Sequence, residues 1–210
     1  IGKGGFFDGS TGSVNCGNSA GIGNINNTTI ELWINVHSNS GNDIFLSKGK
    51  YKNNGWYLWN YPDGKTALSL NDNLNTYAYN TTSSIFVQDQ WIYLAVYFNQ
   101  TSLVFYKNGA QFGNSIPISG WNTNISDNLL IGAFNDSGYN FNGSIDEVRI
   151  SSALRPSNWI AVSYSNQKSP YLFYSIGSEE AAVSAIFSNY YGIYAAAPIT
   201  NELIIFSNYS

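Results

Sequence analysis

The chain has 210 residues, of which 43% are hydrophobic and 16% aromatic, while only 10% are charged and the net charge is −4. This length and composition fit one sizeable globular domain with a short appendage and exclude an intrinsically disordered chain. The acidic balance without a basic patch argues against a nucleic-acid partner, and no apolar run reaches the ~18 residues of a membrane-spanning helix.

Cys16 is the single cysteine, so no intrachain disulfide can form, and we expect a small buried or half-buried thiol there. A charge-poor, aromatic-rich surface suits an extracellular setting, and the lack of disulfides favours a prokaryotic source. The sequence therefore predicts a secreted or cell-surface protein, either a mature product or a fragment of a larger multidomain protein.

The first half of the chain shows short strands separated by turn residues. A glycine-rich start over residues 4–12 indicates a first edge strand. Residues 29–36 alternate between aliphatic side chains on one face and polar or aromatic ones on the other, which predicts a half-buried strand. Further strands are expected, with a Pro-Asp-Gly turn among them, at residues 44–47, 56–61, 67–70 and 76–79.

The second half continues this pattern. Residues 91–98 place apolar or aromatic side chains on both faces, which predicts a central strand covered on both sides. Asn108-Gly109, after a strand at 103–107, is the strongest hairpin signal. Strands are expected at 129–134 and 144–150, with a single helical segment near 156–165. Such recurring short strands predict an all-β fold, a two-sheet antiparallel jelly-roll sandwich.

The strand at 144–150 contains a carboxylate that needs an explanation. With regular alternation, Asp146 shares a face with Val148 and Ile150, while Glu147 and Arg149 form a surface pair on the other face. A carboxylate on an apolar face needs a partner, because an uncompensated buried charge is costly. Asp146 is therefore a candidate site residue.

Three stretches of the chain resemble a known family. They are Phe7-Asp8-Gly9 with Ile30-Glu31-Leu32-Trp33-Ile34, then 91–96 with 104–109, and finally Leu130-Ile131-Gly132 with 141–150. In this order they resemble the opening, the central hairpin and the end of a laminin-G-like domain of the concanavalin A-like lectin/glucanase superfamily. The resemblance covers about residues 5–178 and implies a concanavalin A-like sandwich, while the fold itself hosts many functions. We place this domain at residues 1–180.

Residues 181–210 form a C-terminal extension that is β-prone and carries one charge, Glu202. The segment 186–190 recurs as 205–209. The extension either adds strands or a hairpin to its own sandwich, or pairs with the open edge of a neighbouring molecule by strand addition. An apolar strand left uncovered would aggregate, so we expect the assembly contacts at Ile186, Phe187, Ile204, Ile205 and Phe206.

The sequence argues against an enzyme. Glucanases of the resembled superfamily use a Glu-x-Asp-x-x-Glu strand, and this spacing does not occur here. The adjacent acids Asp146-Glu147 and Glu179-Glu180 alternate between faces if extended, so neither forms a facing carboxylate pair. His37 lies in a loop-like stretch without a nucleophile nearby in the sequence, so we expect a surface histidine.

The resemblance implies a structural calcium ion as a cofactor. In related domains an Asp at the start of the last main strand binds calcium together with oxygens from the N-terminal region. Asp146 occupies that position and Asp8 is the N-terminal candidate, and carboxylates suit a hard cation. Alternatively, Asp146 accepts backbone N–H bonds or caps a turn.

Several aromatic side chains are candidates for stacking on sugar rings. They are Trp33, Trp56, Trp59, Trp121 and Tyr139, and for each tryptophan the core of the sandwich is the better assignment. We single out Tyr139, in the loop between two strands, and Trp121 as glycan-binding residues. Eight Asn-x-Ser/Thr sequons occur, which is compatible with N-glycosylation of an exported protein. We expect glycans at the loop positions Asn27, Asn80 and Asn135.

Two hypotheses of function follow. The first is a non-catalytic surface protein, structural or adhesive, that forms a homo-oligomer, a fibre or a layer through its C-terminal strands. The alternative is a lectin-like module that recognises a polysaccharide through its end loops.

Overall fold

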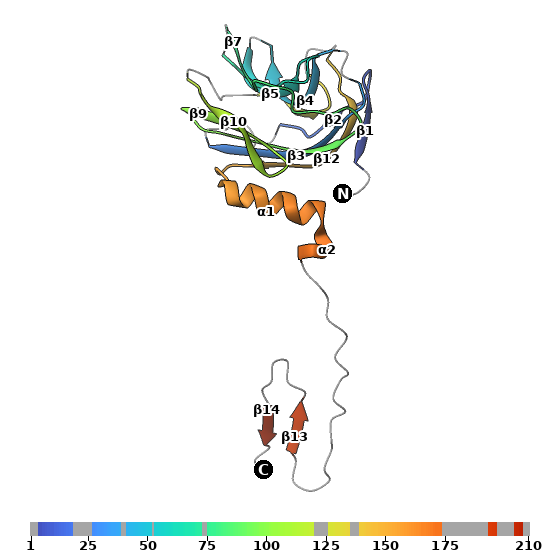
Figure 1. Cartoon of the computed structure of the whole chain (residues 1–210), viewed down its shortest axis with the longest axis vertical. Helices are drawn as coiled ribbons and strands as arrows, with labels where there is room; N and C mark the ends of the chain where they lie inside the picture. The colour runs from blue at the N-terminus through green and yellow to red at the C-terminus, as the bar shows by residue number, and fades with distance from the viewer. Residues whose placement is uncertain are drawn as a thin grey trace. The chain divides into compact units, whose positions relative to one another are not determined.

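The computed structural model describes residues 4–18, 27–38, 41–51, 53–72, 75–119, 126–134, 139–173, 193–196 and 204–207. The chain divides into two units, Ile1–Phe173 and Tyr174–Ser210. The first unit is a sandwich of two antiparallel six-stranded sheets, shown in Figure 1. The predicted jelly-roll fold is confirmed.

The first sheet has the strand order β1-β12-β3-β8-β9-β10. Its members, in that order, are Gly5–Asp8, Asn142–Ser151, Thr28–Val36, Trp91–Phe98, Ser102–Lys107 and Ala110–Pro117. The N-terminal strand lies at an edge and β8 inside the sheet, both as predicted. Asn108 and Gly109 turn between β9 and β10 with φ angles of 51° and 81°, the left-handed pair that a tight hairpin requires.

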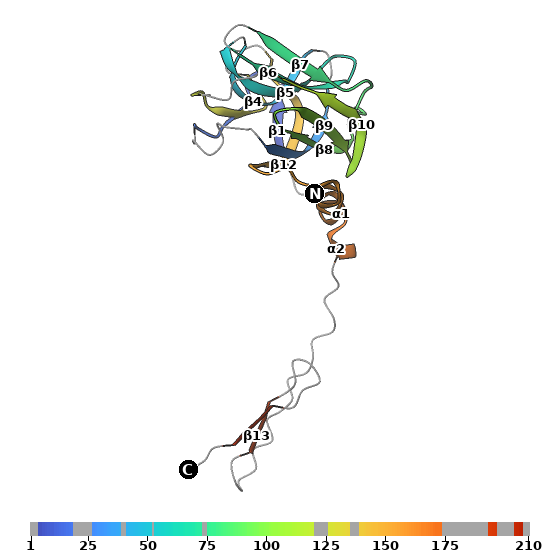
Figure 2. The same cartoon turned by 90° about the vertical axis from the view of Figure 1, so that its left-hand side faces the viewer.

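The second sheet has the order β2-β11-β4-β5-β6-β7. Its members, in that order, are Val14–Asn15, Leu129–Ile131, Asp43–Lys50, Asn53–Asn60, Thr66–Asn71 and Thr76–Asn80. Side chains from the facing sides of both sheets form one core, in which Phe45, Trp56, Leu94 and Phe105 are almost fully buried. Figure 2 shows β4 to β7 on the far side of this core from the helix α1, Ser157–Lys168.

Helix α1 covers the outer face of the first sheet and corrects the prediction that residues 29–36 are half-buried. Glu31 and Trp33, on the outer side of β3, are 1% and 2% exposed. The Trp33 indole stacks on Tyr164 of α1, and its Nε1 donates a hydrogen bond to Gln167 Oε1 at 2.7 Å. The outer face of β3 thus belongs to a second buried layer. This layer could not be predicted from the sequence, because the helix that covers it contains many polar residues.

The buried Glu31 is held by polar partners. The Tyr93 hydroxyl donates a hydrogen bond to Glu31 Oε1, and Arg149 Nη1 lies 3.9 Å from Oε2. Burial, and then the Glu31 carboxylate, raise the pKa of Tyr93, so the phenol remains a donor. This network compensates a carboxylate that would be costly without partners.

The regular alternation predicted for the strand at 144–150, which is β12, is wrong. The register between β12 and β3 shifts between Asp146 and Arg149, and Glu147 has a φ of 51°. This β-bulge adds one residue, so that Val148 and Ile150 face the core together with Ile145. Asp146 is consequently displaced from the apolar face, and its Oδ1 accepts the backbone N–H of Glu147 at 2.9 Å.

Two further predictions are corrected. The strand expected at 129–134 ends at Ile131, because Gly132 takes a left-handed φ of 78° against the ring of Phe7. Cys16 is exposed, since it directly follows the edge strand β2. The helix expected near 156–165 is α1 itself, followed by the short helix α2, Pro170–Phe173.

In the second unit, β13 (Ile193–Ala196) and β14 (Ile204–Ser207) pair antiparallel with each other. Ile204, Ile205 and Phe206 belong to β14, while Ile186 and Phe187 lie outside the described residues. Pairing with a neighbouring molecule therefore remains a prediction for this unit. Neither α1 nor α2, the helices among the described residues, has the length and apolarity needed to cross a membrane.

Candidate functional site

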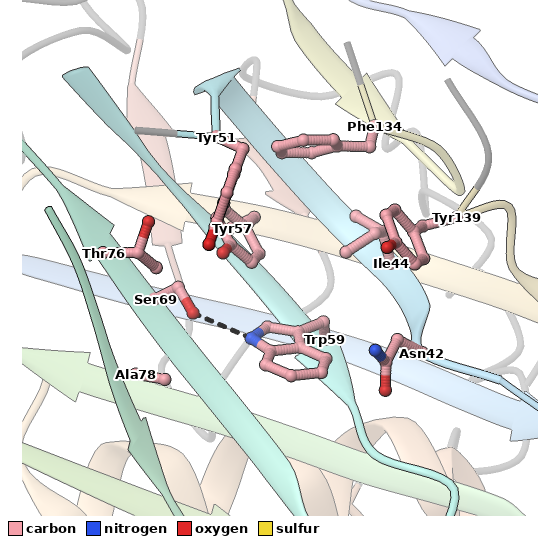
Figure 3. A pocket seen from close by; sticks show the side chains of 10 residues that line it. All are labelled: Asn42, Ile44, Tyr51, Tyr57, Trp59, Ser69, Thr76, Ala78, Phe134 and Tyr139. Carbon is pink, nitrogen blue, oxygen red and sulfur yellow. Dashed lines mark hydrogen bonds between the residues drawn. The ribbon is translucent and has the colours of Figure 1, made fainter. Parts of the chain in front are cut away.

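A cavity of about 570 Å³ lies on the outer face of the second sheet. Strand alternation directs Trp56 and Leu58 of β5 into the core and Tyr57 and Trp59 to the outer face. Figure 3 shows the side chains around the cavity. It is lined by Asn42, Ile44, Tyr51, Tyr57, Trp59, Ser69, Thr76, Ala78, Phe134 and Tyr139.

Two rings of β5 form the base of this cavity. Tyr57 and Trp59 are 8% and 9% exposed, with ring centroids 6.1 Å apart. Trp59 Nε1 donates a hydrogen bond to Ser69 Oγ on β6 at 2.9 Å, the dashed line in Figure 3. This bond holds the indole in one orientation, so the ring is in place before any ligand arrives.

Tyr57 adds a polar group to the base. Burial raises the pKa of its phenol above the ordinary value, an effect that hydrogen bonds from Ser69 and Thr76 partly offset. The hydroxyl therefore stays protonated and neutral at physiological pH. It contributes both a donor and an acceptor beside an apolar ring.

The rim carries exposed aromatic side chains. Tyr51, after β4, is 54% exposed, and Tyr139 is 49% exposed. A parallel bridge between Ile44 and Asn140 brings the segment of Tyr139 against β4. Phe134 packs edge-on against Tyr57 at 5.0 Å, so that rings from three parts of the chain surround one cavity.

The described residues that line the cavity carry no charge. Asp43 lies between the lining residues Asn42 and Ile44 but is 7% exposed, and alternation along β4 directs it away from the cavity. Burial raises the pKa of its carboxyl to about 6, although a hydrogen bond with Asn60 acts in the opposite direction. Its Oδ2 has no hydrogen-bond partner among the described residues.

The residues predicted to stack on sugar rings lie in different environments in the structure. Tyr139 is exposed and lines the cavity, whereas Trp121 lies outside the described residues. Trp56 is in the core and Trp33 is under α1, but Trp59, assigned to the core from sequence, contacts the cavity. Tyr51, Tyr57 and Phe134 also line the cavity and were not among the candidates from the sequence. The signal was the run Trp56-Tyr57-Leu58-Trp59, which puts aromatic rings on both faces of one strand.

The predicted calcium ligands are not brought together. Asp8 pairs with Asn142, four residues along β12 from Asp146, or roughly 13 Å. Asp8 Oδ1 instead accepts the backbone N–H groups of Ser10, Thr11 and Gly12 at 2.8, 2.9 and 3.2 Å, and these bonds, that of Thr11 foremost, lower its pKa. The described residues contain no cluster of three acidic, His or Cys side chains. They do not fit a two-aspartate calcium site, and calcium binding stays a prediction.

His37 has partners that are distant in the sequence. Its Nδ1 lies 2.7 Å from Asp89 Oδ1 and its Nε2 lies 3.3 Å from Ser144 Oγ. Ser144 is inside β12, which pairs with β1 and β3 on its two sides. Its neighbouring amides therefore serve the sheet ladder rather than an oxyanion site, and we assign these contacts to fastening the end of β3.

Of the three asparagines expected to carry glycans, Asn27 and Asn80 are exposed. Asn27 directly precedes β3, and Asn80 is the last residue of β7 rather than a loop residue, with Nδ2 donating to Thr81 O at 3.1 Å. Asn135 lies outside the described residues. Glycosylation at these three positions remains a prediction.

Comparison with known proteins supports this architecture. A sequence model of the concanavalin A-like lectin/glucanases superfamily matches residues 8–180. A search of curated protein sequences gave no match.

Solved structures share the fold. The CBM40 module of the Ruminococcus gnavus IT-sialidase superimposes with a TM-score of 0.64 at 15% identity, over 76% of this chain and 96% of that one. Domain 4 of AbnA, a GH43 extracellular arabinanase from Geobacillus stearothermophilus in complex with arabinotriose, gives 0.58 at 19% identity, over 75% and 74%. The binding domain of botulinum neurotoxin serotype G gives 0.64 at 14% identity, over 96% and 56%. At these identities the likeness shows the fold alone.

Proposed function

This chain belongs to the concanavalin A-like lectin/glucanase superfamily, and from this premise we propose that it is a non-catalytic carbohydrate-binding module. The observation that carries the proposal is the ring-lined cavity on the outer face of the second sheet. Two structural neighbours have bound sugars, arabinotriose in the arabinanase domain and α2,3-sialyllactose in the CBM40 module.

The cavity supplies the two kinds of contact that a sugar requires. A pyranose or furanose ring presents C–H groups that pack on an aromatic face, and Trp59, Tyr51 and Tyr139 offer such faces. Its hydroxyl groups need hydrogen-bond partners, which the partly exposed Asn42 and Thr76 provide. A cavity of about 570 Å³ lies within the ~300–1,000 Å³ range of small-ligand sites.

The sheet-face site differs from the end loops that the sequence suggested. Tyr139 belongs both to an end loop and to the sheet-face cavity, because its loop is bridged to β4 at Ile44. The proposed module acts outside the cell, where polysaccharides are accessible. Self-assembly through residues 181–210 remains a separate prediction, which light scattering of full-length and 1–180 chains would test.

Binding to an oligosaccharide panel by isothermal titration calorimetry tests the proposal, using the full chain. Tyr139→Ala and Tyr51→Ala remove exposed rim rings, and we expect each to weaken binding at least tenfold. Tyr171→Ala is the matched control, because Tyr171 on α2 is 75% exposed and does not line the cavity. Equal affinities for all three variants, or no binding to any sugar, would overturn the proposal.

A further inference from the structure

Resting on the proposed function, we infer that the ligand is an uncharged, soluble oligosaccharide. Acidic glycans and the flat surfaces of crystalline polysaccharides are excluded as preferred ligands. Three properties of the cavity carry this inference: the charge of its lining, the angles between its rings and the protonation of its polar groups.

The lining offers no cation to a carboxylate or sulfate. Three cationic side chains among the described residues have partners away from the cavity. Lys48 Nζ donates to Asn18 Oδ1 and Asp127 O at 3.0 and 2.8 Å, Lys65 pairs with Asp63 at 2.6 Å, and Arg149 Nη1 donates to Ser163 Oγ of α1 at 3.4 Å. Lys50, beside Tyr51 in the chain, does not line the cavity. An acidic sugar would lose water around its charge without gaining an ion pair.

The local field further disfavours an anion. Asp43 lies directly behind the cavity wall, between Asn42 and Ile44, and the chain as a whole carries a net charge of −4. A carboxylate on the ligand would be repelled by both, and Asp43 would be hard to screen because it is buried. A neutral sugar meets neither penalty.

The rings form a cup rather than a plane. The interplanar angle is 44° between Tyr57 and Trp59 and 66° between Tyr57 and Phe134, and all three rings line the cavity. A crystalline polysaccharide surface can lie flat only on rings that share one plane. Rings inclined at these angles instead surround a single sugar unit from several sides, which suits a free chain in solution.

The polar groups match sugar hydroxyls. Thr76 has a hydroxyl group, Asn42 has an amide, and the phenol of Tyr57 is kept protonated. All of these donate and accept hydrogen bonds without charge. They recognise a ligand whose polar groups are hydroxyls.

Calorimetry on the full chain compares three probes: neutral gluco-, galacto- and arabino-oligosaccharides, their acidic counterparts (sialyllactose and oligogalacturonate), and microcrystalline cellulose in a sedimentation assay. We expect saturable binding of at least one neutral oligosaccharide that changes less than twofold between 50 and 500 mM NaCl, with at least tenfold weaker binding of the acidic probes. Cellulose should leave the protein in the supernatant.

Each alternative result has a separate meaning. Tighter binding of an acidic probe, weakened by salt, overturns this inference but retains the proposed function, and Lys50 and Lys52, which flank Tyr51, would then be substituted. Sedimentation with cellulose also overturns it. Binding to none of the probes overturns the proposed function itself. A gain-of-charge variant, Ala78→Lys, gives an independent check, because a cation on the lining should raise affinity for the acidic probe at least threefold; no change would contradict the charge argument.

Discussion

The indole nitrogen of Trp59 donates its hydrogen bond to the hydroxyl of Ser69 across the β5–β6 pair, at 2.9 Å. The bond joins a nine-tenths-buried ring to a fully buried serine. It therefore satisfies a donor that would otherwise be left without a partner, and it orients the ring at the base of the candidate site.

Ser69→Ala should lower the free energy of unfolding by about 1–3 kcal/mol, because it leaves the buried indole N–H unpaired. It should also weaken sugar binding several-fold, since the ring is no longer held in one orientation. Urea denaturation and calorimetry measure the two effects. Ser152→Ala, at an exposed position after β12, is the control, and equal stability of both variants would contradict this role.

Asp43→Asn should stabilise the protein at pH 7 and not at pH 4. Burial raises the pKa of the Asp43 carboxyl to about 6 against about 3.9 in an unfolded chain. The folded state therefore binds the proton more tightly, and the resulting stability is present below pH 4 and lost as the pH rises to 6. The variant should gain about 1–3 kcal/mol at pH 7.

Urea denaturation at several pH values measures this gain. Asp63→Asn is the matched control, because hydrogen bonds to Lys65 lower the pKa of that carboxyl, which reverses the sign. A gain for Asp43→Asn that is as large at pH 4 as at pH 7 would show that its carboxyl does not titrate in this range.

Tyr93→Phe should destabilise the protein, because it removes the hydroxyl that donates to the buried Glu31. Among the described residues, the remaining carboxylate then keeps Arg149, at 3.9 Å. We expect a loss of about 1–3 kcal/mol, compared with a change within about 0.5 kcal/mol for the exposed Tyr171→Phe. Denaturation of Tyr93→Phe/Glu31→Gln should recover part of the loss; no recovery would remove Glu31 from the explanation.

Gly132→Ala should be far more costly than Gly113→Ala, although both glycines have a φ of 78°. A side chain at Gly132 meets the ring of Phe7, whereas at Gly113 nothing lies within 4 Å. The shared backbone strain costs about 1 kcal/mol, so the excess measures the steric clash. We expect at least 2 kcal/mol of excess, and equal losses would show that Phe7 moves aside.

The fold could be predicted because it depends on local patterns. Alternation, turn residues and the Asn108-Gly109 hairpin identified most strands, and the motifs around 141–150 identified the sandwich. Two features of the fold could not be predicted from the sequence, for physical reasons. The β-bulge after Asp146 breaks the period of two without any glycine at the inserted residue, and the burial of Glu31 and Trp33 depends on a helix more than a hundred residues away.

The candidate site was less predictable, because it is formed by residues that alternation alone assigns to either face. Tyr139 was singled out correctly as an exposed ring. Trp59 was a stacking candidate for which the core was preferred; it is 9% exposed and also lines the cavity. Only the pairing of β4, β5, β6 and β7 reveals that the outer face of that sheet is aromatic as well.

For the proposed carbohydrate-binding module, the helix α1 on the first sheet would also limit the number of binding sites per domain. A sandwich has two outer sheet faces, and here one is packed under a helix while the other carries the cavity. A single copy would therefore bind a polysaccharide at one site on its sheet faces. Strong attachment to a polymer would come from avidity, when several linked copies bind it at a high effective concentration. It would not come from a second sheet-face site on the same copy.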